Sequence, residues 1–138
     1  MRRASVHSAL AIVAILGAAS VARARCAPIA LPQEVRQSAY VVEAVLVEAG
    51  DTATFRTIQI YKGGPSAPSR FTLGARQGRG HWPWHESSNV GQPYILLLQR
   101  NGDGYTVYRC GSSGPANDAT RRELEGQGLH PQAPPPMP

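Results

Sequence analysis

The stretch from Gly80 to Glu86, GHWPWHE, holds the residue types most able to do chemistry. His81, His85 and Glu86 supply two imidazoles and a carboxylate, which are suitable ligands for zinc or copper. Pro83 stands between the histidines and opposes a helix, so their spacing does not place both on one helical face. A metal site at His81, His85 and Glu86 is therefore only the alternative interpretation, and we expect no cofactor.

The two tryptophans of this stretch, Trp82 and Trp84, favour a binding loop. Tryptophan is large and stiff and is typical of binding hot spots, so these rings could bind a protein or glycan partner. The competing interpretation is that one or both rings fold back to close the end of a barrel, and both arrangements can hold together. Ser87 and Ser88 lack a nucleophile-elbow context, and we expect no enzyme.

The N-terminus has the pattern of a secretory signal. Arginines near the start precede an almost wholly apolar run from Ala9 to Ala22, and an A-x-A cleavage site ends at Ala24. The run is too short to cross the roughly 30 Å core of a bilayer as a helix. The bulky Arg25 also stands where a lipoprotein signal needs a small residue. We expect residues 1–24 to be removed, and the protein to be secreted or periplasmic without a membrane anchor.

Export changes what the composition implies. The 138 residues include 14 lysines and arginines against 9 acidic residues, a net charge of +5. Removal of residues 1–24 leaves 11 basic residues and a net charge of +2, which is too mild for a phosphate-backbone footprint. We therefore expect no nucleic-acid partner. About 110 residues remain, enough for one small domain, which we expect to be a monomer.

Between Ala39 and Cys110 the chain alternates short apolar segments with turn-forming residues. This pattern predicts five strands, over residues 39–48, 52–62, 70–73, 94–99 and 105–110. The apolar parity of the second strand shifts between Phe55 and Ile58, as it does where a β-bulge bends a strand. Gly114 and Pro115 are predicted to open a short helix, because proline suits the first helical turn.

The number of strands selects the fold class. Five strands fit an all-β Greek-key barrel of the oligonucleotide/oligosaccharide-binding (OB) type with a short C-terminal helix. They are too few for an immunoglobulin-like sandwich. We expect residues 25–128 to form this barrel domain. Residues 129–138 are proline-rich, and we expect them to be a disordered tail.

Four short motifs, in this order, resemble the netrin-like domain, the family of the tissue inhibitors of metalloproteinases. The motifs are CAP at 26–28, IYKG at 60–63, YILLL at 94–98 and YRCG at 108–111. The resemblance covers most of the chain after the signal and implies an OB-type barrel whose N-terminal segment is stapled to it. It also implies that Cys26, Ala27 and Pro28 contact a partner.

The sequence departs from the inhibitory members of that family at one decisive position. Those members begin with a C-x-C pair, and the free amine and carbonyl of the first cysteine chelate the zinc of the protease. Cys26 matches the second cysteine, whereas Ala24 stands in place of the first, and cleavage would leave Arg25 as the first residue. The resemblance therefore carries over the fold but not the inhibitory chemistry, and we interpret the chain as an exported protein-interaction module.

We predict that Cys26 and Cys110 form a disulfide, since an even pair of cysteines in an oxidising compartment is typical of one. Closing a loop of about 85 residues stabilises a fold by roughly 4–5 kcal/mol in the chain-entropy model. Cys110→Ala should therefore lower the free energy of unfolding in urea by about 2–5 kcal/mol. Alkylation of the unreduced protein should label neither cysteine, and labelling of both would contradict the pairing.

Overall fold

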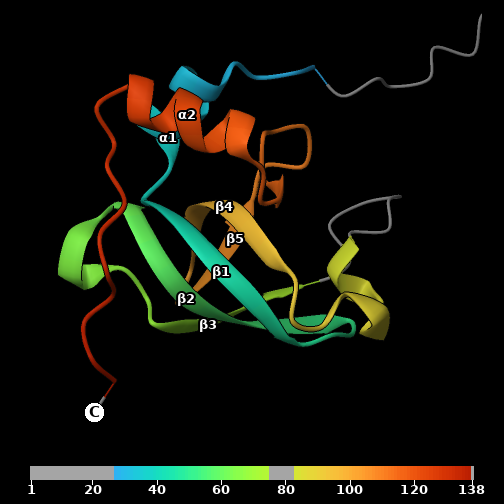
Figure 1. Ribbon diagram of the computed structural model, residues 1–138. Helices are drawn as coiled ribbons and strands as arrows, with labels where there is room; N and C mark the ends of the chain where they lie inside the picture. The colour runs from blue at the N-terminus through green and yellow to red at the C-terminus, as the bar shows by residue number, and fades with distance from the viewer. Residues whose placement is uncertain (1–26, 75–82, 138) are drawn as a thin grey trace, which may run out of the picture.

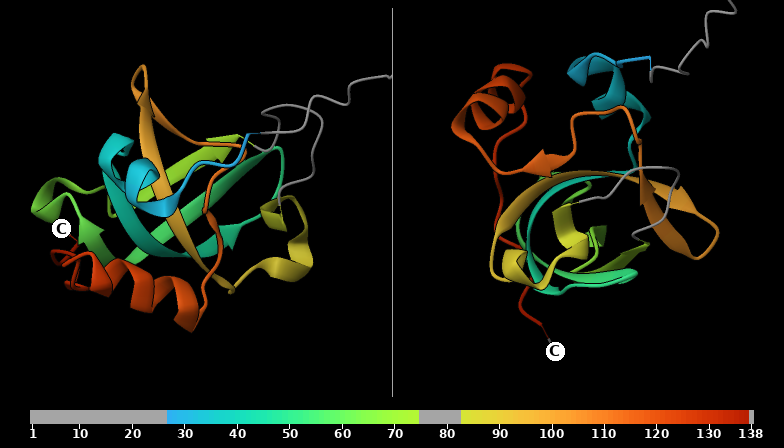
Figure 2. Two further views of the ribbon diagram at one scale, coloured as in Figure 1. Left: turned by 90° about the horizontal axis from the view of Figure 1, so that it is seen from above. Right: turned by 90° about the vertical axis from the view of Figure 1, so that its right-hand side faces the viewer.

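The computed structural model describes residues 27–74 and 83–137 (Figure 1). Five main strands form one curled sheet, and two helices lie over one side of it (Figures 1 and 2). The strands are β1 (Tyr40–Glu48), β2 (Thr52–Lys62), β3 (Arg70–Gly74), β4 (Pro93–Asn101), β5 (Gly104–Val107) and the two-residue β6 (Gly114–Pro115). The helices are α1 (Leu31–Gln37) and α2 (Asp118–Gly126), and short 3-10 turns cover Gly64–Ser66, Pro83–His85 and Ser87–Asn89.

The sheet curls into a partly open barrel. Its strand order is β3-β2-β1-β4-β5, every pair is antiparallel, and β6 pairs with β4. The two outer strands approach each other (Figure 2, right). The rings of Phe71 on β3 and Tyr105 on β5 meet edge to face at 6.1 Å. The predicted fold class, an all-β five-stranded OB-type Greek-key barrel with a short C-terminal helix, is therefore confirmed.

A bulge in β2 bends the strand around the barrel. Glu43 pairs with Gln59 while the next residue, Ala44, pairs with Thr57, so Ile58 has no partner on β1. An extra residue of this kind increases local twist and bends the bulged strand. The predicted shift of parity between Phe55 and Ile58 is thus confirmed.

The apolar side chains form two separate cores. The first fills the barrel and contains the inward residues Val42, Ala44, Leu46, Phe55, Phe71, Trp84, Tyr94, Leu96 and Leu98 among others. The second lies between the outer face of the sheet and the helices and contains Leu31, Val35, Val41, Tyr61, Ile95, Leu97 and Leu124. Alternate residues of β1 and β4 therefore enter different cores, as expected for strands buried on both faces.

The C-terminal helix begins later than the sequence predicts. Gly114 and Pro115 pair with Ile95 and Tyr94 instead of opening a helix. The helix begins at Asp118, because the side chain of the preceding Asn117 accepts a 2.9 Å hydrogen bond from the Thr120 N–H. Neither helix in the described ranges is long and apolar enough to cross a membrane.

The first half of the C-terminal tail differs from the predicted disorder. Gln132 and Ile60 exchange two backbone hydrogen bonds of 2.8 Å, so the tail runs beside β2 (Figure 1). Leu129 packs against the core below the helices. The proline-rich composition gave no sign of this contact, because the backbone partner is Ile60 of β2, 72 residues earlier in the chain.

Candidate functional site

Trp84 does not form a binding surface, which corrects one of the predicted partner-binding residues. Its side chain is fully buried in the barrel core. The ring meets Phe55 at 5.7 Å and Tyr94 at 5.8 Å, both edge to face, an arrangement favoured by the charge distribution of aromatic rings. The 3-10 turn Pro83–His85 thus folds inward, and Trp84 closes the barrel end. Trp82 lies outside the described residues.

The histidine loop is only partly described. His85 is half-buried and its Nδ1 lies 3.7 Å from the Asp51 Oδ1, while Glu86 is exposed. His81 lies outside the described residues, so the metal alternative stays untested. Within residues 27–74 and 83–137, no group of three or more histidine, cysteine, aspartate or glutamate side chains could hold a metal ion.

The segment before α1 keeps two of the predicted contact residues on the surface. Ala27 and Pro28 are exposed, and α1 begins three residues later with Leu31 buried against the sheet. Cys26 lies outside the described residues, and its predicted bond to the half-buried Cys110 stays a prediction. Figure 1 shows this segment passing the loop between β5 and β6, which contains Cys110.

Glu34 joins α1 to that loop. Its side chain is fully buried, and its Oε2 accepts a 2.6 Å hydrogen bond from the backbone N–H of Ser112. The other oxygen, Oε1, has no hydrogen-bond partner among the described residues. A Cβ atom on Gly111 would overlap the carboxyl group, so glycine is required for this close approach.

Burial disfavours the charged form of this carboxyl. Removal from water raises the pKa of Glu34, and hydrogen bonding by Ser112 opposes the shift only in part. When the folded-state pKa lies above the unfolded-state pKa, the folded chain binds more protons than the unfolded chain at pH values between the two. The contribution of Glu34 to stability is therefore largest at low pH and is lost as the pH rises through the folded-state pKa.

Lys62 holds the other end of α1. Its Nζ donates to the carbonyl oxygens of Val35 at 2.7 Å and Ser38 at 2.6 Å. These carbonyls lie at the helix C-terminus, where a cation is favourable because of the helix dipole. Since Lys62 ends β2, the short helix is fixed to the barrel at its end as well as at Glu34.

A second buried carboxylate fixes α2. Glu43, on the outer face of β1, accepts hydrogen bonds from Arg121 through Nε at 3.1 Å and Nη2 at 2.7 Å. Arg121 also donates to Asp118 at 2.8 Å. The bidentate contact is a strong, orienting form of ion pair, and it raises the pKa of Arg121.

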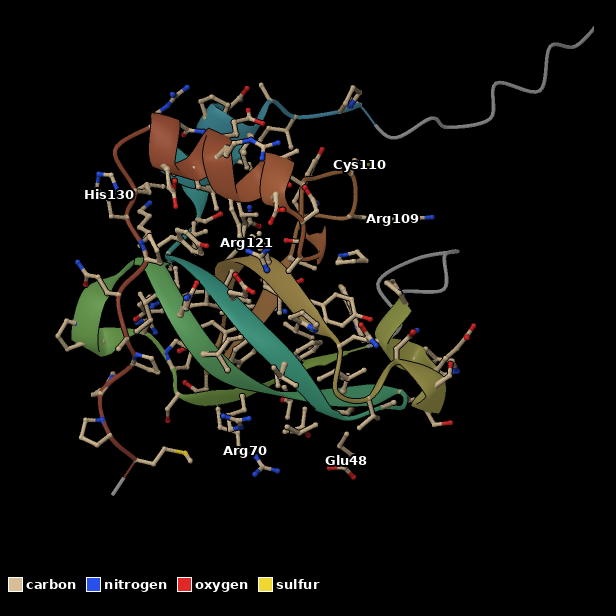
Figure 3. All side chains as sticks on the ribbon, viewed as in Figure 1. Glu48, Arg70, Arg109, Cys110, Arg121 and His130 are labelled. Atoms are coloured by element: carbon tan, nitrogen blue, oxygen red, sulfur yellow. The ribbon has the colours of Figure 1, made fainter. Side chains whose placement is uncertain are left out.

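The loop that Glu34 contacts also exposes an aromatic and a charged side chain. Tyr108 is 37% exposed, and Arg109 beside it is exposed. Figure 3 shows Arg109 and Cys110 at the end of the molecule where the N-terminal segment lies. We call Ala27, Pro28, Tyr108 and Arg109 the N-terminal surface.

Sequence reasoning missed the buried acids that build this region, although a pattern for each was present. Glu34 shares a helical face with Leu31 and Val35, which are three residues before it and one after it. Glu43 interrupts an otherwise apolar strand. A charged residue at an apolar position predicts a buried partner, but the sequence does not identify that partner.

The N-terminal surface offers a partner a tyrosine, an arginine and a conformationally restricted proline. Tyrosine and arginine are enriched among the residues that dominate binding energy. No known protein-family model matches the chain, and no curated protein matches it. The assignment of a function therefore rests on the fold and on this surface.

We predict that Trp84→Ala lowers the free energy of unfolding by about 3–5 kcal/mol, because it removes a large side chain from the core and leaves a cavity. Urea denaturation of the parent and the variant measures the difference. The control is Val90→Ala, which shortens a neighbouring side chain that is 46% exposed and should change stability by less than about 0.5 kcal/mol. Equal losses in the two variants would contradict the capping role.

We also predict that the unfolding free energy of the Glu34→Gln variant rises relative to that of the parent as the pH rises from 4 to 7. Glutamine cannot ionise, so the variant escapes the cost of charging a buried carboxyl. The difference in unfolding free energy should grow by about 1.4 kcal/mol for each unit by which the folded-state pKa exceeds the unfolded one.

Urea melts at several pH values measure this difference. The matched control, Glu123→Gln, removes the same charge from an exposed position of α2. A difference for Glu34→Gln that stays constant with pH, or that parallels the control, would show that the Glu34 carboxyl is not forced towards its neutral form.

Proposed function

We propose that this protein is an exported, single-disulfide, netrin-like barrel that acts as a protein-interaction module and binds its partner through the N-terminal surface. The observation that carries the proposal is the buried hydrogen bond between Glu34 and Ser112. It joins residues 78 positions apart in the sequence. It ties α1, into which the segment containing Ala27 and Pro28 leads, to the loop that contains Tyr108 and Arg109.

Rigidity matters because binding costs the ordering of the residues that make contact. The α1 helix is fixed by Glu34 and by Lys62, so the chain that leaves it is already positioned. The predicted disulfide between Cys26 and Cys110 would add a covalent tie at the same end. A netrin-like arrangement, with the N-terminal segment held against the barrel, is what these contacts support.

The chemistry of the surface favours a protein partner. The Tyr108 ring supplies apolar area and a hydroxyl, and Arg109 supplies a planar guanidinium that can pair with a carboxylate or stack on a ring. Trp84 contributes nothing to this surface because it is buried in the barrel. The bound partner is therefore expected to contact the loop before β6 and not the Pro83–His85 turn.

We expect a photo-reactive p-benzoyl-phenylalanine placed at position 108 of the mature protein to cross-link to one defined exported protein. The same group at position 90, which is also exposed but lies in the loop before β4, should not cross-link to it. Arg109→Glu should weaken binding of that purified protein by at least tenfold, since it reverses one charge at the contact. Cross-linking that is the same from both positions, or unaffected by Arg109→Glu, would refute the proposal.

A further inference from the structure

Two arginines stand directly opposite each other on the outer face of the barrel. In the ladder between β2 and β3, Arg56 pairs with Arg70. Their neighbours Phe55 and Phe71 point into the barrel, where the rings stack at 5.5 Å. Because side chains alternate along a strand, both arginines point outward, and both are exposed.

The register places these two side chains as close as a sheet allows. The Thr57 N–H donates to the Ser69 carbonyl at 2.9 Å, so Thr57 and Ser69 form a hydrogen-bonded pair. Pairs alternate along an antiparallel ladder, and the adjacent Arg56 and Arg70 therefore form a non-hydrogen-bonded pair, in which side chains are nearest. Like charges directly opposite each other in this way destabilise a sheet.

Within residues 27–74 and 83–137, neither Arg56 nor Arg70 lies within ion-pair distance of a carboxylate. The ion pairs there involve Arg121 and His85, and neither Arg56 nor Arg70 takes part. The exposed Glu48 accepts a hydrogen bond from Thr54 at 3.4 Å. The guanidinium groups of Arg56 and Arg70 thus face solvent from opposite positions of the ladder and can donate to an anion.

A hollow of about 210 Å³ adjoins Arg56. Its walls are Arg56, Thr57 and Ser69 on the barrel side and Pro134, Pro135, Pro136 and Met137 on the tail side. The tail is kept in place by the paired hydrogen bonds between Gln132 and Ile60. The volume is many times the roughly 10–15 Å³ that one water molecule needs, so the hollow accommodates a body larger than a single oxyanion.

We propose that Arg56 and Arg70 bind a tetrahedral oxyanion ester, a phosphate or a sulfate, and that the sugar carrying it sits in the hollow. Two guanidinium groups supply planar, multiple N–H donors that match the oxygens of such an ester. On the barrel side, Arg56 and Ser69 supply polar groups for sugar hydroxyls, and the proline side suits the apolar face of a sugar ring. Phosphorylated and sulfated sugars share this chemistry.

The site does not depend on the proposed partner surface. Figure 3 places Arg70 on the opposite side of the barrel from Arg109. Arg56 and Arg70 belong to neighbouring strands, while the N-terminal surface is built from the chain before α1 and the loop after β5. Binding at one site is therefore measured separately from binding at the other.

The test is an NMR titration of the ¹⁵N-labelled mature protein with glucose 6-phosphate, glucose 6-sulfate and glucose at constant ionic strength. We expect saturable shifts at the amides of Arg56, Thr57, Ser69 and Arg70 with both esters and none with glucose. The tighter of the two esters identifies the source of the oxyanion. Shifts that do not saturate by 10 mM, or that sodium chloride reproduces, would overturn the proposal.

Variants separate this site from general charge attraction. Arg56→Gln and Arg70→Gln should each weaken binding of the esters at least tenfold. Both should fold normally, because each relieves a repulsion on an exposed strand position. The control, Arg122→Gln, removes the same charge from the exposed side of α2 and should leave binding unchanged. If all three variants bind the esters equally more weakly, the attraction comes from net charge alone and the proposed site is refuted.

A truncated protein tests whether the tail forms one wall of the sugar site. Removal of residues 133–138 deletes the proline wall but keeps Arg56, Arg70 and the Gln132 contact. The truncated protein should bind inorganic phosphate as the full chain does, and should lose the advantage of glucose 6-phosphate over inorganic phosphate. An advantage that survives truncation would contradict the placement of the sugar in the hollow.

Discussion

The structure depends on the burial of β1 on both faces. Val42, Ala44 and Leu46 point into the barrel, while Val41 and Glu43 point outward and are also buried. An outward apolar face on a central strand must be covered, because exposed apolar area is unfavourable in water. The barrel alone cannot cover it, so α1 and α2 are required as an outer layer. The positions of the N-terminal segment and of the loop after β5 follow from that requirement.

The outer layer contains two buried carboxyl groups with contrasting environments. Glu43 has the bidentate guanidinium of Arg121, so its charge is compensated and it directs where α2 lies. Glu34 has one backbone donor and an unpaired oxygen among the described residues, so burial opposes its ionisation. The apolar contacts of Leu31 and Val35 hold α1 in place despite this cost. One acid therefore orients a helix, whereas the other makes a helix contact that depends on pH.

The barrel could be predicted from the sequence because strand periodicity and turn residues are local properties. The β2 bulge, visible as a shift of parity between Phe55 and Ile58, belongs to the same class. The start of α2 and the path of the tail could not be predicted in this way. The edge of β4 pairs with Gly114 and Pro115 and so delays the helix until its Asn117 cap, and the free backbone groups of Ile60 hold the tail. Both partners are far away in the sequence.

The candidate site was predictable only in part for the same reason. Trp84 has the residue type of a binding hot spot, but its place is decided by a space in the barrel between Phe55 and Tyr94. Composition cannot show that space. By contrast, Ala27 and Pro28 lie on the surface, and their contact with a partner stays a prediction. The hydrogen bond between Glu34 and Ser112 links α1 to the loop that contains Tyr108 and Arg109. It joins residues 78 positions apart and cannot be read from the sequence.

Because Trp84 is buried, the side chains that a ligand can reach are smaller in number and less aromatic than the sequence suggests. Trp84 stabilises the barrel, and a rigid barrel separates the N-terminal surface at one end from the Arg56 and Arg70 pair on the other side (Figure 3). Residues that stabilise a fold gain by leaving water, whereas residues that recognise a ligand must remain available to it. The exposed Tyr108, Arg109, Arg56 and Arg70 belong to neither core and therefore remain available to a ligand.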